Sequence, residues 1–255
     1  VGNYGLDQIY LKYSYTNIPK NIKTVYIGFV PETLSRCLSS WKHYQEFNNI
    51  YAFKPKFNLK NKKLILRNNP IQSMKDFNKI EKLINELKKS EFFYEEKFLK
   101  HKLSFPYLIS FMKNIKHNYN LILFSFLKIL NINQNKIYDF IINTNCKKND
   151  YYYTKKNNTD LLYKLLLSID KISKKKNHKL VFLIFPQKYD LSIKNKAYQK
   201  FFQRMKNKFN VIDFTEIFLK DNVNKLYLEG KYGGHLTSYG NKVVAKTILK
   251  KRLIN

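Results

Sequence analysis

The stretch GGHLTSYGN, residues 233–241, contains His235, one of only five histidines in the 255-residue chain. Histidine serves as a general base because its ring exchanges a proton near neutral pH. Residues that favour turns and helix starts surround His235, and Thr237 or Ser238 is expected to cap the helix that follows. A single loop histidine is more often structural than catalytic, so other residues must decide whether His235 does chemistry.

Two apolar runs predict the strands that would position such a histidine. Residues 22–29 read IKTVYIGF, and residues 179–186 read KLVFLIFP, with six consecutive uncharged apolar residues before the proline. A shorter strand is predicted over residues 210–214, NVIDF. Short, fully apolar strands without polar alternation are typical of a parallel sheet that is covered on both faces. We therefore expect the strands at 22–29 and 180–185 to be central.

Helices are predicted before, between and after these strands. The periodic spacing of apolar residues, with polar caps and Pro19 as a stop signal, predicts helices over residues 6–17, 158–177, about 195–208 and about 238–252. Strands that alternate with amphipathic helices indicate an α/β fold.

The middle of the chain, residues 38–157, does not follow this alternation. Residues 51–70 contain two extended segments around a polar turn and predict a hairpin, and lysine-rich helices are predicted after it. We interpret this region as an insertion within a single domain of residues 1–255, packed on the edge of the sheet or over its mouth.

The composition excludes several classes of protein. Hydrophobic residues make up 44% of the chain, which indicates a folded protein. The net charge of +30 comes almost entirely from lysines along the whole chain, with only four arginines. Specific nucleic-acid sites depend on arginine for bidentate contacts that lysine cannot make, so we predict no specific nucleic-acid binding.

Neither a metal nor a cofactor is expected. Cys37 and Cys146 are too few for a disulfide framework or a zinc site, and each is interpreted as a small buried apolar residue. The other four histidines show no ligand spacing. The longest apolar run, residues 119–130, is interrupted by Lys128 and is too short to span a bilayer. The chain opens on Val1 without the pattern of a signal peptide, which suggests a fragment or a processed protein.

Four segments occur in the order found in a known family: VGNYGLDQ (1–8), VYIGFVPETLSR (25–36), FKPKF (53–57) and GGHLTSYGNKVVA (233–245). They resemble a bacterial branch of the SGNH/GDSL hydrolase superfamily. The resemblance implies a flavodoxin-like three-layer α/β/α sandwich with a mainly parallel sheet. It also implies hydrolysis or transfer of acyl esters, often on carbohydrates. The family's Gly-Asp-Ser block, which supplies the nucleophile, is absent. We therefore expect the first strand of the sheet to be missing and an edge to be exposed beside the chain start.

The resemblance assigns roles to individual residues. His235 matches the catalytic base, and the backbone N–H of Asn3, with Gly2 and Gly5 as neighbours, matches a donor of the oxyanion hole. Glu32 stands where the family often has asparagine, and an ionised carboxylate cannot donate a hydrogen bond. No aspartate precedes His235 at the family spacing, and Glu229 is the nearest acidic residue. Further candidates for contacting substrate or supporting these groups are Glu32, Arg36 and Glu229.

Two functions remain open on the sequence alone. The first is a hydrolase or acyltransferase that takes a small-molecule or glycan ester and whose nucleophile lies upstream of Val1. The second is a non-catalytic domain of the same fold that binds carbohydrate or acts as a scaffold. The departures at Glu32 and Tyr232 favour the second function, and His235 with its surroundings favours the first.

Overall fold

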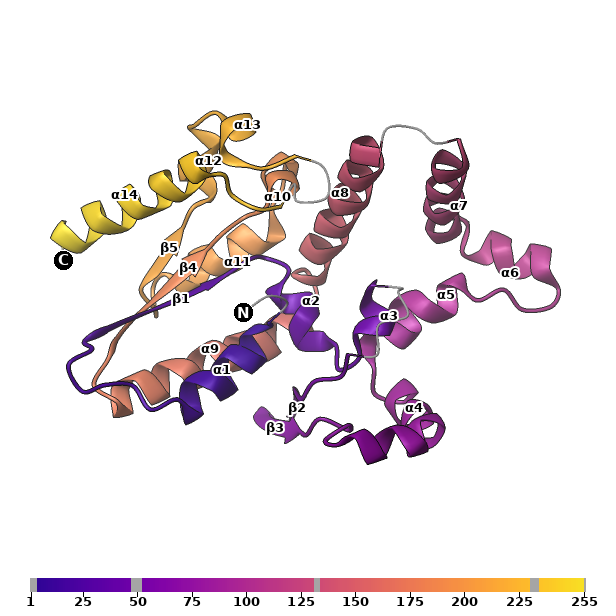
Figure 1. The fold of residues 1–255 in the computed structure, drawn as a ribbon, viewed down its shortest axis with the longest axis horizontal. Coiled ribbons are helices and arrows are strands. Elements are labelled where there is room, and N and C mark those ends of the chain that lie inside the picture. Colours follow the sequence, from indigo (N-terminus) through magenta and orange to yellow (C-terminus); the bar gives the residue numbers. More distant parts are fainter. Residues whose placement is uncertain (1–3, 47–51, 131–133, 230–233, 255) are drawn as a thin grey trace.

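The computed structural model describes residues 4–46, 52–130, 134–229 and 234–254, and it contains a three-stranded parallel sheet (Figure 1). The strands are β1 (Thr24–Phe29), β4 (Lys179–Ile184) and β5 (Val211–Asp213), in the order β1-β4-β5. The predicted parallel pairing of the two apolar runs is confirmed, with Ile27 opposite Phe182. The expectation that both are central is correct for β4 and wrong for β1, which pairs on one side only within the described part of the chain.

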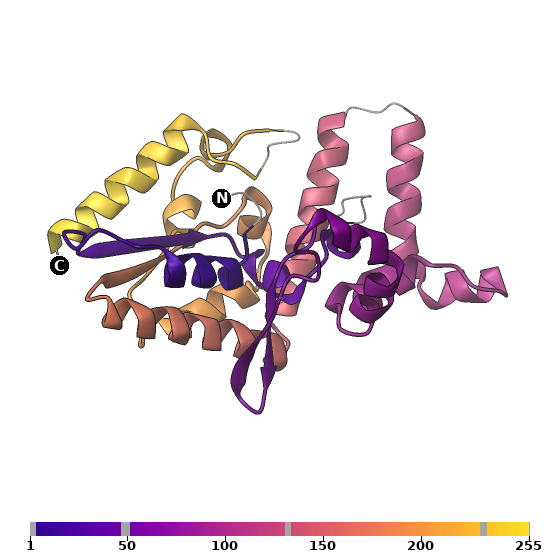
Figure 2. The same cartoon turned by 60° about the horizontal axis from the view of Figure 1, so that its bottom comes forward.

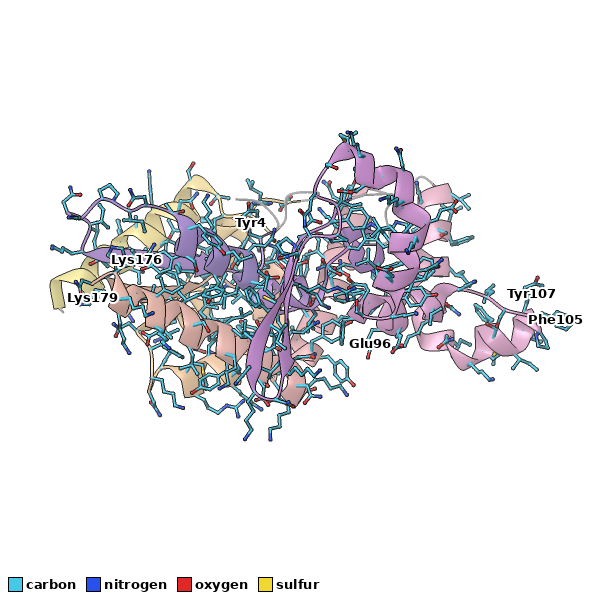
Figure 3. All side chains as sticks on the ribbon, turned by 90° about the horizontal axis from the view of Figure 1, so that it is seen from below. Tyr4, Glu96, Phe105, Tyr107, Lys176 and Lys179 are labelled. Carbon is cyan, nitrogen blue, oxygen red and sulfur yellow. The ribbon has the colours of Figure 1, made fainter. Side chains whose placement is uncertain are left out.

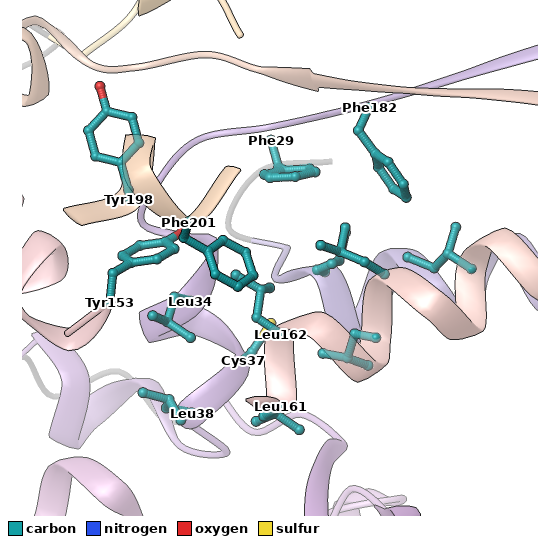
Figure 4. Close-up of a cluster of buried hydrophobic side chains, with 14 of the residues drawn as sticks. Phe29, Leu34, Cys37, Leu38, Tyr153, Leu161, Leu162, Phe182, Tyr198 and Phe201 are labelled. Carbon is teal, nitrogen blue, oxygen red and sulfur yellow. The ribbon is translucent and has the colours of Figure 1, made fainter. Parts of the chain in front are cut away.

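Three helices cover one face of the sheet: α1 (Leu6–Tyr15), α9 (Lys156–Lys175) and α11 (Ala197–Met205). The leucines of α9 recur every three or four residues, so one stripe of this helix faces inward. Leu162 and Leu165 on this stripe are fully buried, in one cluster with aromatic side chains of β1 and β4. Figure 4 shows Leu162, Phe29 and Phe182 in this cluster. This cluster is the larger of the two cores.

The opposite face of the sheet carries the last part of the chain. Alternate residues of β4 and β5, such as Val181, Leu183 and Ile212, pack there with buried side chains that include Phe214 and Phe218. The helices on this side are α12 (Thr215–Leu219), α13 (Val223–Leu226) and α14 (Ser238–Ile254). The predicted helix over residues 238–252 is thus present. The Oγ1 of Thr237 accepts a hydrogen bond from the N–H of Gly240 at 3.1 Å, which confirms Thr237 as its cap.

The middle region extends sideways from the carboxyl end of the strands (Figures 1 and 2). It contains the predicted hairpin, formed by β2 (Lys56–Lys60) and β3 (Lys63–Arg67). Asn61 and Lys62 both have positive φ, as a tight two-residue hairpin turn requires. The remaining elements here are α2 (Thr33–Leu38), α3 (Lys42–Glu46), η1 (Met74–Lys79), α4 (Ile80–Lys88), η2 (Tyr94–Phe98), α5 (Leu99–His101), α6 (Tyr107–Lys113), α7 (Ile115–Ile129) and α8 (Gln134–Tyr152).

One helix of the middle region stands against the sheet's carboxyl end. This helix, α8, packs on α10 (Lys188–Ser192), the short helix that follows β4. Among the described residues, no helix is long and apolar enough to cross a bilayer.

Replacement of Leu165 by alanine is expected to lower the free energy of unfolding by about 3 kcal/mol, because it leaves a cavity between α9 and the sheet. The matched change Leu249→Ala, on the exposed face of α14, should cost less than about 0.5 kcal/mol. Chemical denaturation of both variants measures the difference. Equal costs would show that α9 does not pack on the sheet as described.

Candidate functional site

The turn before α1 packs directly on α2, the helix that follows β1. The carbonyl oxygen of Gly5 accepts a hydrogen bond from Ile9 N–H at 3.1 Å, and the N–H of Leu6 donates to Thr33 Oγ1 at 2.9 Å. A Cβ on Gly5 would lie 3.1 Å from the backbone nitrogen of Cys37 and 2.5 Å from Asp7 Oδ1, so this close approach requires glycine. The turn therefore lies at the carboxyl end of β1. The other turn candidates, Gly2 and Asn3, lie outside the described residues.

Asp7 anchors this turn from the inside. Its carboxylate is fully buried and forms an ion pair with Lys54 Nζ at 2.5 Å. The N–H of Gln8 donates to Asp7 Oδ1 at 2.9 Å, and the thiol of Cys37 lies 3.8 Å from the same oxygen. Burial raises the pKa of Asp7, while the charge of Lys54 acts in the opposite direction. The pair joins α1, α2 and the segment that leads into the hairpin.

Sequence reasoning did not select Asp7 or Lys54. Both lie within quoted segments, VGNYGLDQ and FKPKF, but nothing in either segment indicates that they meet. A lysine flanked by aromatic and proline residues is the only local signal that Lys54 enters a buried environment.

Glu32 and Arg36 form an ion pair on α2. Glu32 immediately precedes this helix, and its Oε2 accepts from Arg36 Nη2 at 2.7 Å. Arg36 also lines a groove of about 480 Å³ that follows the unpaired side of β1. Glu32 lines a separate polar pocket of about 220 Å³, together with Ser35 and Lys148. The structure thus places both candidates beside cavities near the carboxyl end of β1.

The loop that carries His235 lies at the carboxyl end of β4. Tyr227 and Leu236 form an antiparallel bridge, and the N–H of Leu228 donates to the carbonyl oxygen of His235 at 2.9 Å. A Cβ on Gly234 would lie 2.7 Å from Nε2 of Gln187, and Gln187 follows β4 by three residues. His235 itself is exposed. Its backbone is therefore fixed on both sides while its ring lies at the surface.

Buried polar groups fill the space beneath this loop. Asp190 on α10 is almost completely buried, and its Oδ2 accepts from the N–H of Gln187 at 2.8 Å. Burial, reinforced by the charge of Glu32, raises the pKa of Asp190 to about 7. The thiol of Cys146 donates to Gln187 Oε1 at 3.5 Å. The loops after β1 and β4 lie close together, because the two strands are adjacent and the N–H of Phe185 donates to the carbonyl oxygen of Phe29 at 2.9 Å.

The last candidate, Glu229, is exposed and belongs to the same edge. Its charge contributes to the raised pKa of Tyr189 on α10, after burial and a hydrogen bond to Asp139. Cys37 and Cys146 are both buried free cysteines, as predicted, and burial raises the pKa of each thiol. Among the described residues, no group of three histidines, cysteines and carboxylates could hold a metal ion.

The structure brings most of the sequence candidates to one edge of the sheet. Gly5, Glu32 and Arg36 lie at the end of β1, and His235 lies at the end of β4, the neighbouring strand. Gly5 and His235, at the carboxyl ends of adjacent parallel strands, occupy the usual place of ligand sites in open α/β sheets. Comparison of the chain with family models, curated proteins and solved structures gives no match.

The Asp7–Lys54 pair is expected to couple the chain start to the hairpin. Asp7→Asn and Lys54→Met should each lower the free energy of unfolding by about 3 kcal/mol, because each leaves a buried charge without its partner. In a double-mutant cycle the coupling should exceed about 1 kcal/mol. The matched control is the exposed pair Glu96–Lys100. Its coupling should be about 0.3–0.5 kcal/mol, the usual value for an exposed ion pair on a helix. Additive effects at Asp7 and Lys54 would contradict the buried pair.

Asp190 is expected to make stability fall as pH rises. The folded chain holds a proton on Asp190 up to a pH of about 7, whereas the unfolded chain releases it near the ordinary aspartate value of 3.8. The free energy of unfolding should therefore decrease as the pH rises from the lower to the higher of these two pKa values. Asp190→Asn mimics the protonated form, so the variant should match the parent near pH 4 and exceed it at pH 8, by at most about 4 kcal/mol.

Chemical denaturation between pH 4 and pH 8 measures this difference. Asp76→Asn is the control, because hydrogen bonds from the N–H groups of Gln72 and Ser73 lower the pKa of that exposed carboxylate. Its contribution to stability is lost as pH falls, so the effect of Asp76→Asn should have the opposite slope. A difference between parent and Asp190→Asn that does not change with pH would refute the buried, protonated state.

Proposed function

We propose that the chain is part of an SGNH-type hydrolase or acyltransferase that acts on ester substrates, including O-acylated carbohydrates, on a flavodoxin-like three-layer α/β/α sandwich. One observation carries the proposal. The two segments that resemble the family's turn and histidine blocks lie at opposite ends of the sequence, yet they meet the carboxyl ends of adjacent strands β1 and β4. The helices on both faces of the sheet support the proposed sandwich.

The unpaired side of β1 is an argument that a further strand completes the proposed active site. The groove along β1 is lined by apolar side chains such as Ile9, Ile27 and Phe29, and it reaches Tyr4 and Arg36 beside the turn. Tyr26 in this strand is partly exposed. A further parallel strand that occupied this groove would end beside the turn and next to the loop of His235. In the proposal, that strand carries the serine nucleophile and does not belong to the 255 residues.

Each group at this edge has a distinct task in the proposed reaction. His235 removes the proton from the serine hydroxyl and returns it to the leaving group. Backbone N–H groups of the turn that ends at Gly5 stabilise the oxyanion. Glu32 is held by Arg36 and accepts hydrogen bonds, so it does not replace the family's asparagine as a donor. Arg36, which lines the groove, contacts the oxygen atoms of the ester substrate.

A second candidate function is a non-catalytic carbohydrate-binding or scaffolding domain of the same fold. The observation in its favour is the Glu32–Arg36 pair, because it occupies a position at which an esterase needs a neutral donor. Polar side chains in the pocket beside Glu32, including Asn145, Lys148 and Asn149, are suited to sugar hydroxyl groups.

Esterase assays on two polypeptides distinguish these functions. The 255-residue chain alone should show no hydrolysis of acetylated saccharides or p-nitrophenyl acetate, because it lacks the nucleophile. A longer polypeptide with the Gly-Asp-Ser strand ahead of residue 1 should be active, and His235→Ala should lower its kcat/KM at least about 100-fold. His178→Ala is the matched control, since His178 lies at the amino end of β4 and contacts Tyr13.

Activity that survives His235→Ala in the longer polypeptide would exclude the catalytic role of His235. A longer polypeptide that is folded and inactive, yet binds saccharides in calorimetry, would support the non-catalytic function instead. Unfolding curves for each variant establish that lost activity does not reflect lost structure.

A further inference from the structure

Two helices of the middle region expose an unusual amount of apolar surface. The segment of residues 102–130, here called the arm, contains α6 and α7 and projects away from the sheet (Figures 1 and 3). Phe105 at its tip is 85% exposed, and Leu108 and Ile129 are 73% and 79% exposed. Soluble monomers rarely leave such side chains in contact with water over a contiguous area. The arm therefore has the properties of an interaction surface.

The exposed residues of α7 form one continuous stripe. Ile115, Tyr119, Ile122, Phe126 and Ile129 follow each other at alternating intervals of four and three residues, and all are more than one third exposed. This spacing places them on one side of the helix. Leu123 and Leu127 are half-buried and lie on another side of α7, and α7 is in contact with α8. The stripe is thus left without a covering element in the described part of the chain.

The positive charge of the arm favours an anionic partner. The arm contains four lysines and no aspartate or glutamate. A second copy of the arm would carry the same net positive charge, which opposes self-association. A surface of phosphate groups is complementary to the lysines and draws them to its plane.

The geometry of α6 favours a lipid surface over a protein groove. Tyr107, Leu108 and Ile109 are consecutive and all exposed, and consecutive helix residues point about 100° apart. A protein groove receives residues from one stripe of a helix. The fluid boundary between acyl chains and headgroups accepts apolar side chains over a wider arc, and aromatic residues such as Phe105 and Tyr107 are favoured there.

The length of α7 sets its orientation at such a surface. Its 15 residues span about 22 Å, which is shorter than the hydrocarbon core of a bilayer, about 30 Å thick. A helix of this length lies in the interface and does not cross it.

We propose that the arm binds the surface of an anionic lipid bilayer. Its apolar side chains insert between the acyl chains, and lysines such as Lys102 and Lys113 contact the headgroup phosphates. The proposal is independent of the esterase function.

Vesicle flotation of the 255-residue chain tests the proposal. The chain should bind vesicles of phosphatidylcholine with about 30% phosphatidylglycerol at least about 10-fold more tightly than vesicles of phosphatidylcholine alone. Raising the salt concentration about tenfold, to about 0.5 M, should weaken this binding. The double variant Phe105→Ser/Leu108→Ser should lose at least about 10-fold in affinity. The control Ile65→Ser/Leu249→Ser removes two exposed apolar residues outside the arm and should bind like the parent.

A second readout follows insertion directly. The chain has one native tryptophan, Trp41, which is buried, so the parent gives the reference spectrum. In Phe105→Trp, the emission of the added tryptophan should shift to shorter wavelength when phosphatidylglycerol vesicles are added, and the shift should be absent in the parent and with phosphatidylcholine alone. Circular dichroism establishes that each variant is folded, which is expected because the substituted side chains are exposed.

Three results would overturn the proposal. One is the absence of binding to anionic vesicles by the folded chain. Another is binding that the arm variant leaves unchanged, since other lysines would then account for it. The third is a dimer in analytical ultracentrifugation that Phe105→Ser/Leu108→Ser dissociates, because the arm would then be an interface between copies of this chain.

Discussion

The position of the candidate site depends on the buried ion pair between Asp7 and Lys54. The 2.5 Å contact joins the first turn of α1 to the segment before the hairpin, and the carboxylate also meets Gln8 and Cys37. A charge with so little access to water is stable in the fold only if its partners stay in place. Gly5 lies two residues before Asp7, so the same contacts fix the turn at the carboxyl end of β1. Every role proposed for that turn rests on this pair.

The sequence allowed the α/β alternation to be predicted because apolar periodicity is a local signal. The runs that became β1 and β4, the leucine stripe of α9 and the hairpin of residues 56–67 all follow from neighbouring residue types. The apolar pattern alone did not predict that β1 lies at the edge, since an apolar strand looks the same whether one side or both are paired, and the expectation of an exposed edge came only from the family resemblance. The partners of Asp7 and the burial of Asp190 depend on residues distant in sequence, so composition and spacing carry no signal for them.

The candidate site has one feature that the family resemblance leads us to expect and one that differs from the family pattern. His235 and Gly5 lie at adjacent strand ends, where parallel sheets commonly bind ligands. Glu32, in contrast, forms an ion pair with Arg36 and offers no donor to an oxyanion. A hydrolase built on this edge must therefore take its donors from backbone N–H groups of the turn. The apolar groove beside β1 explains why the nucleophile is sought on a further strand and not on a loop of the described chain.

The proposed hydrolase is best tested by an experimental structure of a polypeptide with a Gly-Asp-Ser strand ahead of residue 1. We expect this strand to fill the groove, to pair in parallel with the free side of β1, and to place its serine Oγ within about 3 Å of a ring nitrogen of His235. A structure in which the side of β1 stays unpaired, or in which the serine and His235 lie on different edges of the sheet, would contradict it.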